Sequence, residues 1–179
     1  LAESVGYNAV GAKQNSKTER HLFQMYSLQK YYEDEGTQPL QGIRNISTSI
    51  KLDGAALSLL YVDGNLVRVL TRGDGVEGQI VTDKFLGNPI VPQTVPFQGV
   101  YQITGEIVAP INIDNARNYA AGALNLKDVA EFRSRALSFF AYGIQPTLAD
   151  TFNEDLRLLK SAGFGVINEP DLDKIFPCD

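Results

Sequence analysis

Lys51-Leu52-Asp53-Gly54 is the stretch around which the chain is organised, because strand-like sequence lies on both sides of it. Residues 46–51 alternate apolar and polar side chains, which is the pattern of a half-buried strand. The alternation places Lys51 on the polar face. We therefore expect this lysine to project away from the core.

Two further strands are predicted at residues 55–62 and 65–70, on either side of Asp63-Gly64. An Asp-Gly pair between two strand-like runs is the strongest short signal for a two-residue hairpin turn. The hairpin would bring the next motif, Thr-Arg-Gly-Asp-Gly at residues 71–75, back to the end of the sheet that carries Lys51.

Lys51, Asp53 and Arg72 would then lie beside Gly73 and Gly75, a combination suited to chemistry on a phosphate. A lysine amine attacks only when it is unprotonated, and partial burial beside another cation favours the neutral amine. Arg72 could supply that cation and bind phosphate oxygens bidentately. The glycines would let backbone N–H groups approach an anion.

Residues 17–35 place His21, Met25 and Leu28 at helical spacing, ahead of an acidic stretch that ends at Gly36, and so predict a helix. His21 is the only histidine of the chain. On such a stretch a histidine is more often structural than catalytic. The pattern alone makes Leu28 a core residue.

Residues 100–108 predict a strand that carries Glu106, and residues 137–144 predict an apolar strand that carries Tyr142. Glu106 is either an inward carboxylate or a solvent-facing one. Tyr142 either stacks on a purine or belongs to the core. Between these strands and the hairpin, the prolines of residues 87–99 predict a surface loop.

Helices are predicted at residues 114–128 and 151–163. The first carries Arg117 in its first turn, where the helix dipole disfavours a cation, so Arg117 either has an external anionic partner or points into solvent. The second begins with a capping box of Thr151 and Glu154.

The composition of the 179 residues suits a single domain with one core. The lone Cys178 excludes an intramolecular disulfide and fits a reducing compartment, the first residues given do not resemble a signal peptide, and no apolar run reaches membrane-spanning length. These features predict a cytoplasmic protein without a membrane partner. Because 16 Lys and Arg face 21 Asp and Glu, for a net charge of −5, any affinity for DNA would come from a local patch or another domain.

Six short motifs occur in order along the chain. They are Met-Tyr-Ser-Leu at residues 25–28, Lys-Leu-Asp-Gly at 51–54, Thr-Arg-Gly-Asp-Gly at 71–75, Gly-Glu at 105–106, Arg-Asn-Tyr-Ala-Ala-Gly at 117–122 and Phe-Phe-Ala-Tyr-Gly at 139–143. Together they resemble the motifs of the adenylation domain of NAD-dependent DNA ligases, over nearly the whole chain.

The resemblance implies an α+β fold of largely antiparallel sheets flanked by helices, the nucleotidyltransferase fold. Residues 1–45 would be a lead-in and N-terminal helix, and residues 46–179 the adenylation core. The family places an NMN-recognising domain before this core, and an Asp-Gly-Val-Val-Ile-Lys motif and two further lysines beyond it. We therefore expect the isolated chain to be incomplete and to react slowly.

The resemblance also implies the roles of individual residues. Lys51 would attack the α-phosphate of NAD, release NMN and carry AMP, with Asp53 and Arg72 as the other catalytic residues. AMP would then pass to a 5′-phosphate at a nick in double-stranded DNA, with Mg²⁺ offsetting phosphate charge and Arg117 contacting the DNA. The residues expected at the nucleotide are Ser27, Leu28, Lys51, Arg72, Glu106 and Tyr142.

The chain departs from the family at four places that bear on adenine recognition and on the nick phosphate, one of which is residues 78–82, Gly-Gln-Ile-Val-Thr in place of a more acidic sequence. Ser49 stands where the family has glutamate, Thr104 replaces an arginine, and Asn125 replaces a second arginine of bacterial relatives. Two other functions stay open from the sequence. One is a nucleotide-binding subunit that is inactive without a partner chain, and the other is an ATP-dependent ligase or capping-type nucleotidyltransferase.

Overall fold

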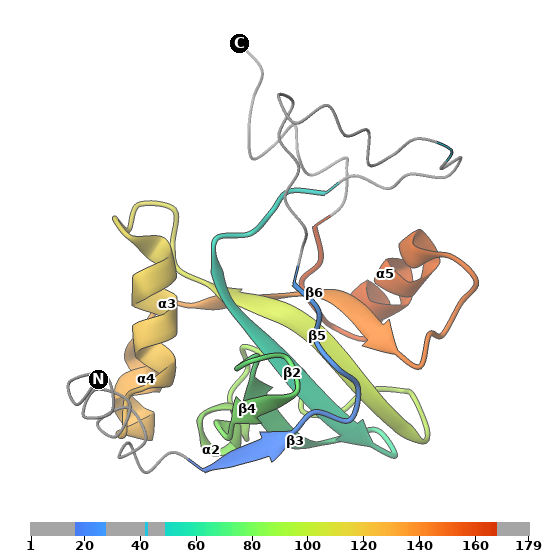
Figure 1. Cartoon of the computed structure of the whole chain (residues 1–179), viewed down its shortest axis with the longest axis horizontal. Helices are drawn as coiled ribbons and strands as arrows, with labels where there is room; N and C mark the ends of the chain where they lie inside the picture. Colours follow the sequence, from blue (N-terminus) through green and yellow to red (C-terminus); the bar gives the residue numbers. More distant parts are fainter. Residues whose placement is uncertain (1–16, 28–41, 43–48, 168–179) are drawn as a thin grey trace, which may run out of the picture.

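The computed structural model describes residues 17–27, 42 and 49–167, which form two antiparallel sheets and flanking helices (Figure 1). The α+β class predicted from the sequence is confirmed. In chain order the elements are β1 (Thr18–Arg20), β2 (Gly54–Val62), β3 (Asn65–Thr71), β4 (Glu77–Gln79), α2 (Thr82–Phe85), β5 (Val100–Val108), α3 (Ala116–Leu124), α4 (Val129–Ser134), β6 (Ser138–Gln145) and α5 (Phe152–Ser161).

The main sheet has four strands in the order β3-β2-β5-β6, and β1 pairs with β4 in a second, smaller sheet. One face of the main sheet is buried, because alternate residues of β2 and β5 are fully inaccessible to solvent. These residues are Leu57, Leu59, Tyr61, Ile103 and Ile107. Helix α3 contacts β2 and β5 and contributes Ala120 and Ala123 to the same core. The opposite face of the sheet does not pack against this core, and a functional site is therefore expected there.

The hairpin of β2 and β3 forms as predicted. Asp63 and Gly64 both adopt positive φ angles, 46° and 83°, which is the requirement of the turn type that matches the twist of paired strands. Gly64 is also needed for space, since a Cβ there would lie 2.6 Å from the carbonyl oxygen of Val95. The loop prediction for residues 87–99 and the strand at Val100–Val108 are likewise confirmed.

The predicted helix at residues 17–35 is wrong over residues 17–27, and its remainder lies outside the described residues. Thr18–Arg20 is a strand that pairs with β4, and no helix follows it up to Ser27. The physical reason is that buried and exposed side chains alternate with a period of two residues along this segment. His21 and Met25 are buried and Phe23 is half-buried, whereas the residues between and after them, Leu22, Gln24 and Tyr26, are exposed, so the chain alternates like an extended segment.

The strand predicted at residues 46–51 is also absent from residues 49–51, the part of this range that the structure describes. Residues 49–53 are irregular, and β2 begins only at Gly54, where the chain pairs with Val108 of β5. Residues 46–48 lie outside the described part. Lys51 therefore sits on the segment that enters the sheet, not on a strand.

The helix predicted at residues 114–128 ends early, at Leu124, and a separate helix, α4, follows it. Asp128 begins this second helix, because its Oδ1 accepts a hydrogen bond of 2.9 Å from the N–H of Ala130. The later helix agrees with the sequence: the Thr151 hydroxyl accepts from the N–H of Glu154 at 3.2 Å, which is the capping contact expected for α5.

Candidate functional site

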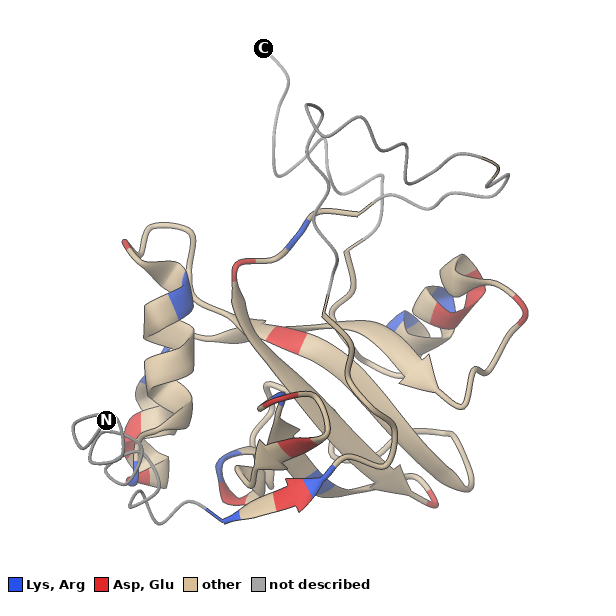
Figure 2. Cartoon of the chain, in the orientation of Figure 1, with Lys and Arg blue, Asp and Glu red and all other residues tan. Residues whose placement is uncertain are grey.

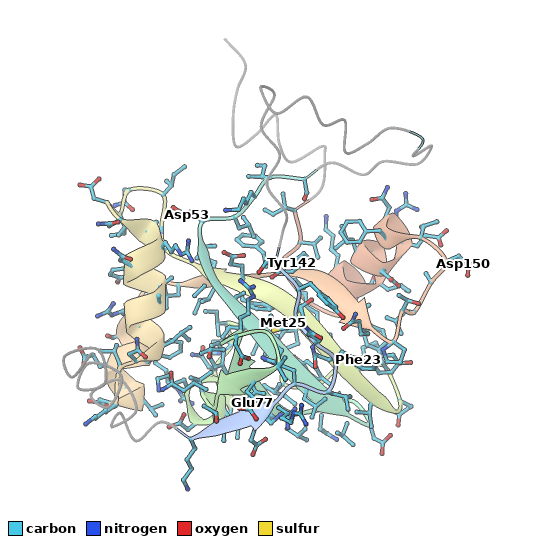
Figure 3. The ribbon with its side chains drawn as sticks, viewed as in Figure 1. Phe23, Met25, Asp53, Glu77, Tyr142 and Asp150 are labelled. Carbon is cyan, nitrogen blue, oxygen red and sulfur yellow. The ribbon has the colours of Figure 1, made fainter. Side chains whose placement is uncertain are left out.

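Residues 17–27, hereafter the crossing segment, run over the face of the main sheet that the core leaves free (Figure 1). The buried Gln102 of β5 holds this segment in place, since its side chain accepts from the N–H of Phe23 at 2.9 Å and donates to the carbonyl of Phe23 at 2.8 Å. Figure 3 shows Phe23 and Met25 on this segment, with Tyr142 beyond them. The crossing segment therefore borders any site on this face of the main sheet.

Figure 2 shows one red band on β5. It is Glu106, the single acidic residue of that strand, whose side chain is only partly exposed. Its Oε1 accepts a hydrogen bond of 3.0 Å from the N–H of Gly54, at the start of β2. Burial raises the pKa of its carboxyl above the ordinary value, while the Gly54 N–H and the positive charges of Lys51 and Arg117 act in the opposite direction. Glu106 is thus partly shielded from solvent, on the face of the sheet opposite the core.

Lys51 and Asp53 lie on the segment that enters β2, and Arg117 lies in the first turn of α3; all three are exposed. The charge of each acts on the Glu106 carboxyl, the two cations lowering its pKa and Asp53 raising it. Lys51 and Asp53 before β2 and Arg117 on α3, two separate parts of the chain, therefore lie close enough to Glu106 for their charges to act on its carboxyl. The partial burial expected of Lys51 is absent, and its amine is open to an incoming substrate.

Arg72 follows directly on β3 and is tied to the sheet by its backbone, whose N–H donates to Ala56 at 3.1 Å. Its guanidinium contacts the hydroxyl of Ser27, on the crossing segment. Its Nε is buried and has no hydrogen-bond partner among the described residues. Two of the predicted nucleotide-binding residues, Ser27 and Arg72, are thus brought together, whereas Leu28 lies outside the described part of the chain.

The glycines of residues 71–75 serve the shape of a turn more than the approach of an anion. Gly73 and Gly75 have φ angles of 59° and 92°, and a Cβ on either would collide with backbone oxygens of Glu77 or Met25. The N–H of Gly75 already donates to the carbonyl of Arg72 at 3.0 Å. The expectation that this N–H is free for a phosphate is therefore wrong.

Tyr142 occupies a β-bulge in β6. The register shifts between Thr104 and Gly105, which pair with Gly143 and Ala141 and leave Tyr142 as the extra residue. Such a bulge re-aims a side chain, and Tyr142 is 39% exposed instead of packed in the core. Burial of its hydroxyl, followed by the Glu106 charge, raises its pKa to about 12, so the hydroxyl stays protonated at neutral pH.

A cavity of about 380 Å³ adjoins Tyr142, between the crossing segment, the end of β6 and helix α5. Its lining includes Met25 and Tyr26 from the crossing segment and Thr104 from β5. Its lining does not include Lys51, Arg72 or Glu106. The arrangement is a hollow beside an aromatic ring, and the charged groups lie outside its lining.

Glu106→Gln tests the electrostatics of the site through stability. The amide keeps an oxygen for the Gly54 N–H but carries no charge. Because the pKa of Glu106 is raised on folding, the native state of the wild type loses stability as pH rises through that raised pKa, and Glu106→Gln does not.

We expect urea unfolding at about pH 4 and about pH 7 to show the variant gaining stability relative to the wild type at the higher pH. A stability difference that does not change with pH would contradict the burial of this carboxylate. Since Glu106 is only partly buried, the gain is expected to be modest.

A lysine that precedes the antiparallel sheet, a glutamate and an aromatic ring on it and an arginine at its edge form a combination suited to a nucleotide-binding protein. The chain belongs to the NAD-dependent DNA ligase adenylation domain family, whose model matches residues 13–175. The family that the six motifs indicated is therefore confirmed.

Curated relatives agree. The chain is similar to a DNA ligase of Sulfurovum sp., with 30% identity over 81% of this chain and 26% of the relative. It is also similar to DNA ligase 1 of Pseudarthrobacter chlorophenolicus, with 32% identity over 82% of this chain and 24% of the relative. The chain spans about a quarter of the length of these relatives. None of the helices in the described part of the chain has the length and apolarity needed to cross a bilayer.

Proposed function

We propose that this chain carries out the AMP-transfer step of an NAD-dependent DNA ligase, with Lys51 as the nucleophile. The observation that carries the proposal is that Glu106 of β5 accepts a hydrogen bond from Gly54, while the charges of Lys51 and Asp53 before β2 and of Arg117 on α3 act on its carboxyl. A lone Lys-x-Asp-Gly match would not require a glutamate from β5 to meet the lysine.

The proposed chemistry uses the amine of Lys51, which is exposed and so open to a substrate. The neutral Nζ of Lys51 attacks the α-phosphorus of NAD, a P–N bond forms, and the P–O bond to NMN breaks, so that NMN leaves as a phosphate and the amine loses its proton. AMP then passes from the lysine to the 5′-phosphate at a DNA nick. Asp53 belongs to the catalytic group as the carboxylate next to the amine.

The remaining site residues hold the nucleotide. Arg72 meets the phosphate charge through its guanidinium, and Glu106 accepts hydrogen bonds from the ribose hydroxyls. Tyr142 stacks on the adenine, which the adjoining cavity supports as the place of the base. Ser27 and Leu28 border the nucleotide, a placement supported for Ser27 by its contact with Arg72.

Mg²⁺ is the expected cofactor, and the donor set decides how it would be held. Among the described residues no group of three or more His, Cys, Asp or Glu side chains could form a metal site. Mg²⁺ often keeps its waters and binds through substrate phosphates and one or two carboxylates, and a single protein carboxylate, Asp53, fits that mode. Its contribution would be to offset negative charge on the phosphates.

The DNA substrate is part of the same proposal. Arg117 is exposed at the start of α3 and its charge reaches the Glu106 carboxyl, which supports contact with a phosphate near the reacting group. With a net charge of −5, most of the grip on nicked DNA would come from other parts of a ligase. We also propose a cytoplasmic location, for which the single cysteine is the support.

The domain assignment likewise stays a proposal: a lead-in at residues 1–45 and an adenylation core at residues 46–179, in one domain. The pairing of β1 with β4 supports counting the crossing segment with the same folded unit. A nucleotide-binding chain that is inactive without a partner is the alternative from another class. It would bind NAD and form no covalent adduct in any polypeptide that contains these residues.

The donor of AMP can be tested directly. NAD and ATP, each labelled in the adenine, are supplied to separate samples of the polypeptide that carries these residues, and covalent label is counted. The proposal predicts label from NAD and far less from ATP. Label from ATP alone would instead favour the ATP-dependent class.

Tyr142→Ala is expected to weaken adenine-nucleotide binding by about 1–3 kcal/mol, the range for losing one aromatic stack on a base. Tyr142→Phe is the matched control, and it should bind almost normally because stacking needs only the ring. Calorimetric titration of each variant with AMP measures both affinities. Equal losses in the two variants would show that the hydroxyl, near Glu106, is the group that matters.

A further inference from the structure

His21 is a buried histidine to which the proposed chemistry gives no role. It lies on the crossing segment, is 8% exposed, and uses both ring nitrogens. Nδ1 lies 2.8 Å from the hydroxyl of Ser58 in β2, and Nε2 lies 2.9 Å from the backbone carbonyl oxygen of Arg72. One side chain thus joins the crossing segment, the sheet and the turn that carries the arginine.

The partners decide the tautomer of the imidazole. A carbonyl oxygen only accepts hydrogen bonds, so Nε2 carries the proton and donates to Arg72. In the neutral ring, Nδ1 then accepts from the hydroxyl of Ser58. Both ring nitrogens are satisfied, as a buried polar group requires.

The surrounding backbone is shaped to hold this ring against the turn. The N–H of His21 donates to the carbonyl of Val76 at 2.9 Å, so the segment and the turn are joined a second time. Gly78 keeps the space open, because a Cβ there would lie 3.1 Å from Cε1 of His21. The Arg72 carbonyl also receives the N–H of Gly75, which places the imidazole at the base of the turn.

We propose that His21 is a positioning residue for Arg72. The bond from Nε2–H to the Arg72 carbonyl fixes the backbone of the arginine, so that its guanidinium meets the phosphate in one orientation. His21 itself touches no substrate. The inference rests on the proposed function in one respect: Arg72 must hold phosphate during AMP transfer.

Two amide variants separate the two ring contacts. The amide nitrogen of glutamine reaches about as far as Nε2, and that of asparagine about as far as Nδ1. His21→Gln therefore keeps a donor for the Arg72 carbonyl, whereas His21→Asn keeps only a group that can meet Ser58. Both variants remove the imidazole and bring a neutral amide, so each is the control for the other.

We expect His21→Asn to lower the single-turnover rate of AMP transfer from NAD by roughly tenfold to a hundredfold, the scale of an angstrom-sized misplacement of a catalytic group. Affinity for AMP should change by less than about threefold, because the base and ribose contacts remain. His21→Gln should recover most of the lost rate. The rates are measured on the polypeptide that carries these residues, with thermal unfolding as the check on folding.

A double-mutant cycle with Arg72→Ala tells positioning from a general loss of structure. If His21 acts through Arg72, His21→Asn causes no further loss of rate in the Arg72→Ala background. Multiplying losses would overturn the proposal, as would equal rates in the asparagine and glutamine variants. If His21→Asn does not fold, Ser58→Ala replaces it, because the Ser58 hydroxyl holds the ring and its tautomer. Either no loss of rate in Ser58→Ala, or a loss that persists in the Arg72→Ala background, would then overturn the proposal.

The same experiment keeps the two proposals apart. A wild-type protein that takes no AMP from NAD contradicts the proposed function. A wild-type protein that takes AMP, with a histidine variant whose effect does not depend on Arg72, contradicts the positioning role alone.

Discussion

Lys51→Ala is expected to abolish covalent AMP transfer completely while the chain keeps its fold. Lys51 supplies the only atom that bonds to phosphorus in the proposed step, and no other group can replace it. The side chain is exposed and precedes β2, so little packing is lost with it. Gel detection of adenine label, together with thermal unfolding, measures the two effects separately.

Lys127→Ala is the matched control, since Lys127 is an exposed lysine between α3 and α4. It should be labelled at the wild-type rate. Lys51→Arg should also stay unlabelled, because a guanidinium keeps the charge but is not a nucleophile. Adduct formation in Lys51→Ala would show that another side chain attacks the phosphate, and unfolding of that variant would show that Lys51 is structural.

Arg72→Ala is expected to slow AMP transfer by about a hundredfold to a thousandfold, the usual effect of removing one preorganised donor from developing charge. Arg72→Lys should restore little, since an ammonium group cannot bind two phosphate oxygens in a fixed plane. Single-turnover kinetics at saturating NAD measure the rate of the chemical step.

Arg157→Ala gives the control for loss of a positive charge, because Arg157 is exposed on α5. A change of less than about tenfold in Arg72→Ala would mean that Arg72 stabilises only the turn. In that case the buried Nε and the contact with Ser27 would be structural features.

Local sequence signals were enough to predict the strands around the hairpin, because each strand is marked by an adjoining turn sequence or by alternating apolar and polar residues. Asp63-Gly64 specified the turn, and the alternation of residues 100–108 gave β5 with its bounds. The family motifs named Lys51, Glu106 and Arg72 without any geometry. How the charges meet around Glu106 required the pairing of β2 with β5, which is long-range information.

The helix prediction for the crossing segment was wrong because the spacing of its apolar residues fits two kinds of structure. His21, Met25 and Leu28 fit a helix, but His21, Phe23 and Met25 fit an extended chain equally well. Tertiary partners decided between them: the side chains of Ser58 and Gln102 on the sheet bind the segment, and an extended chain reaches both. A single sequence does not reveal these partners.

Neither the bulge at Tyr142 nor the role proposed for His21 could be predicted from the sequence, for a related reason. An apolar strand with a tyrosine gives no sign of an extra residue, since the bulge is a property of the pairing with β5. A histidine on its own was correctly expected to be structural, and only its bond to the Arg72 carbonyl links it to the chemistry.

The most direct test of the account is to find the residue that carries AMP. The polypeptide that contains this chain is incubated with NAD, digested, and its peptides are examined by mass spectrometry, while released NMN is counted. We expect one AMP adduct, on the Lys51 side chain, with one NMN released for each adduct. An adduct on any other residue, or NMN release without a lysyl adduct, would contradict it.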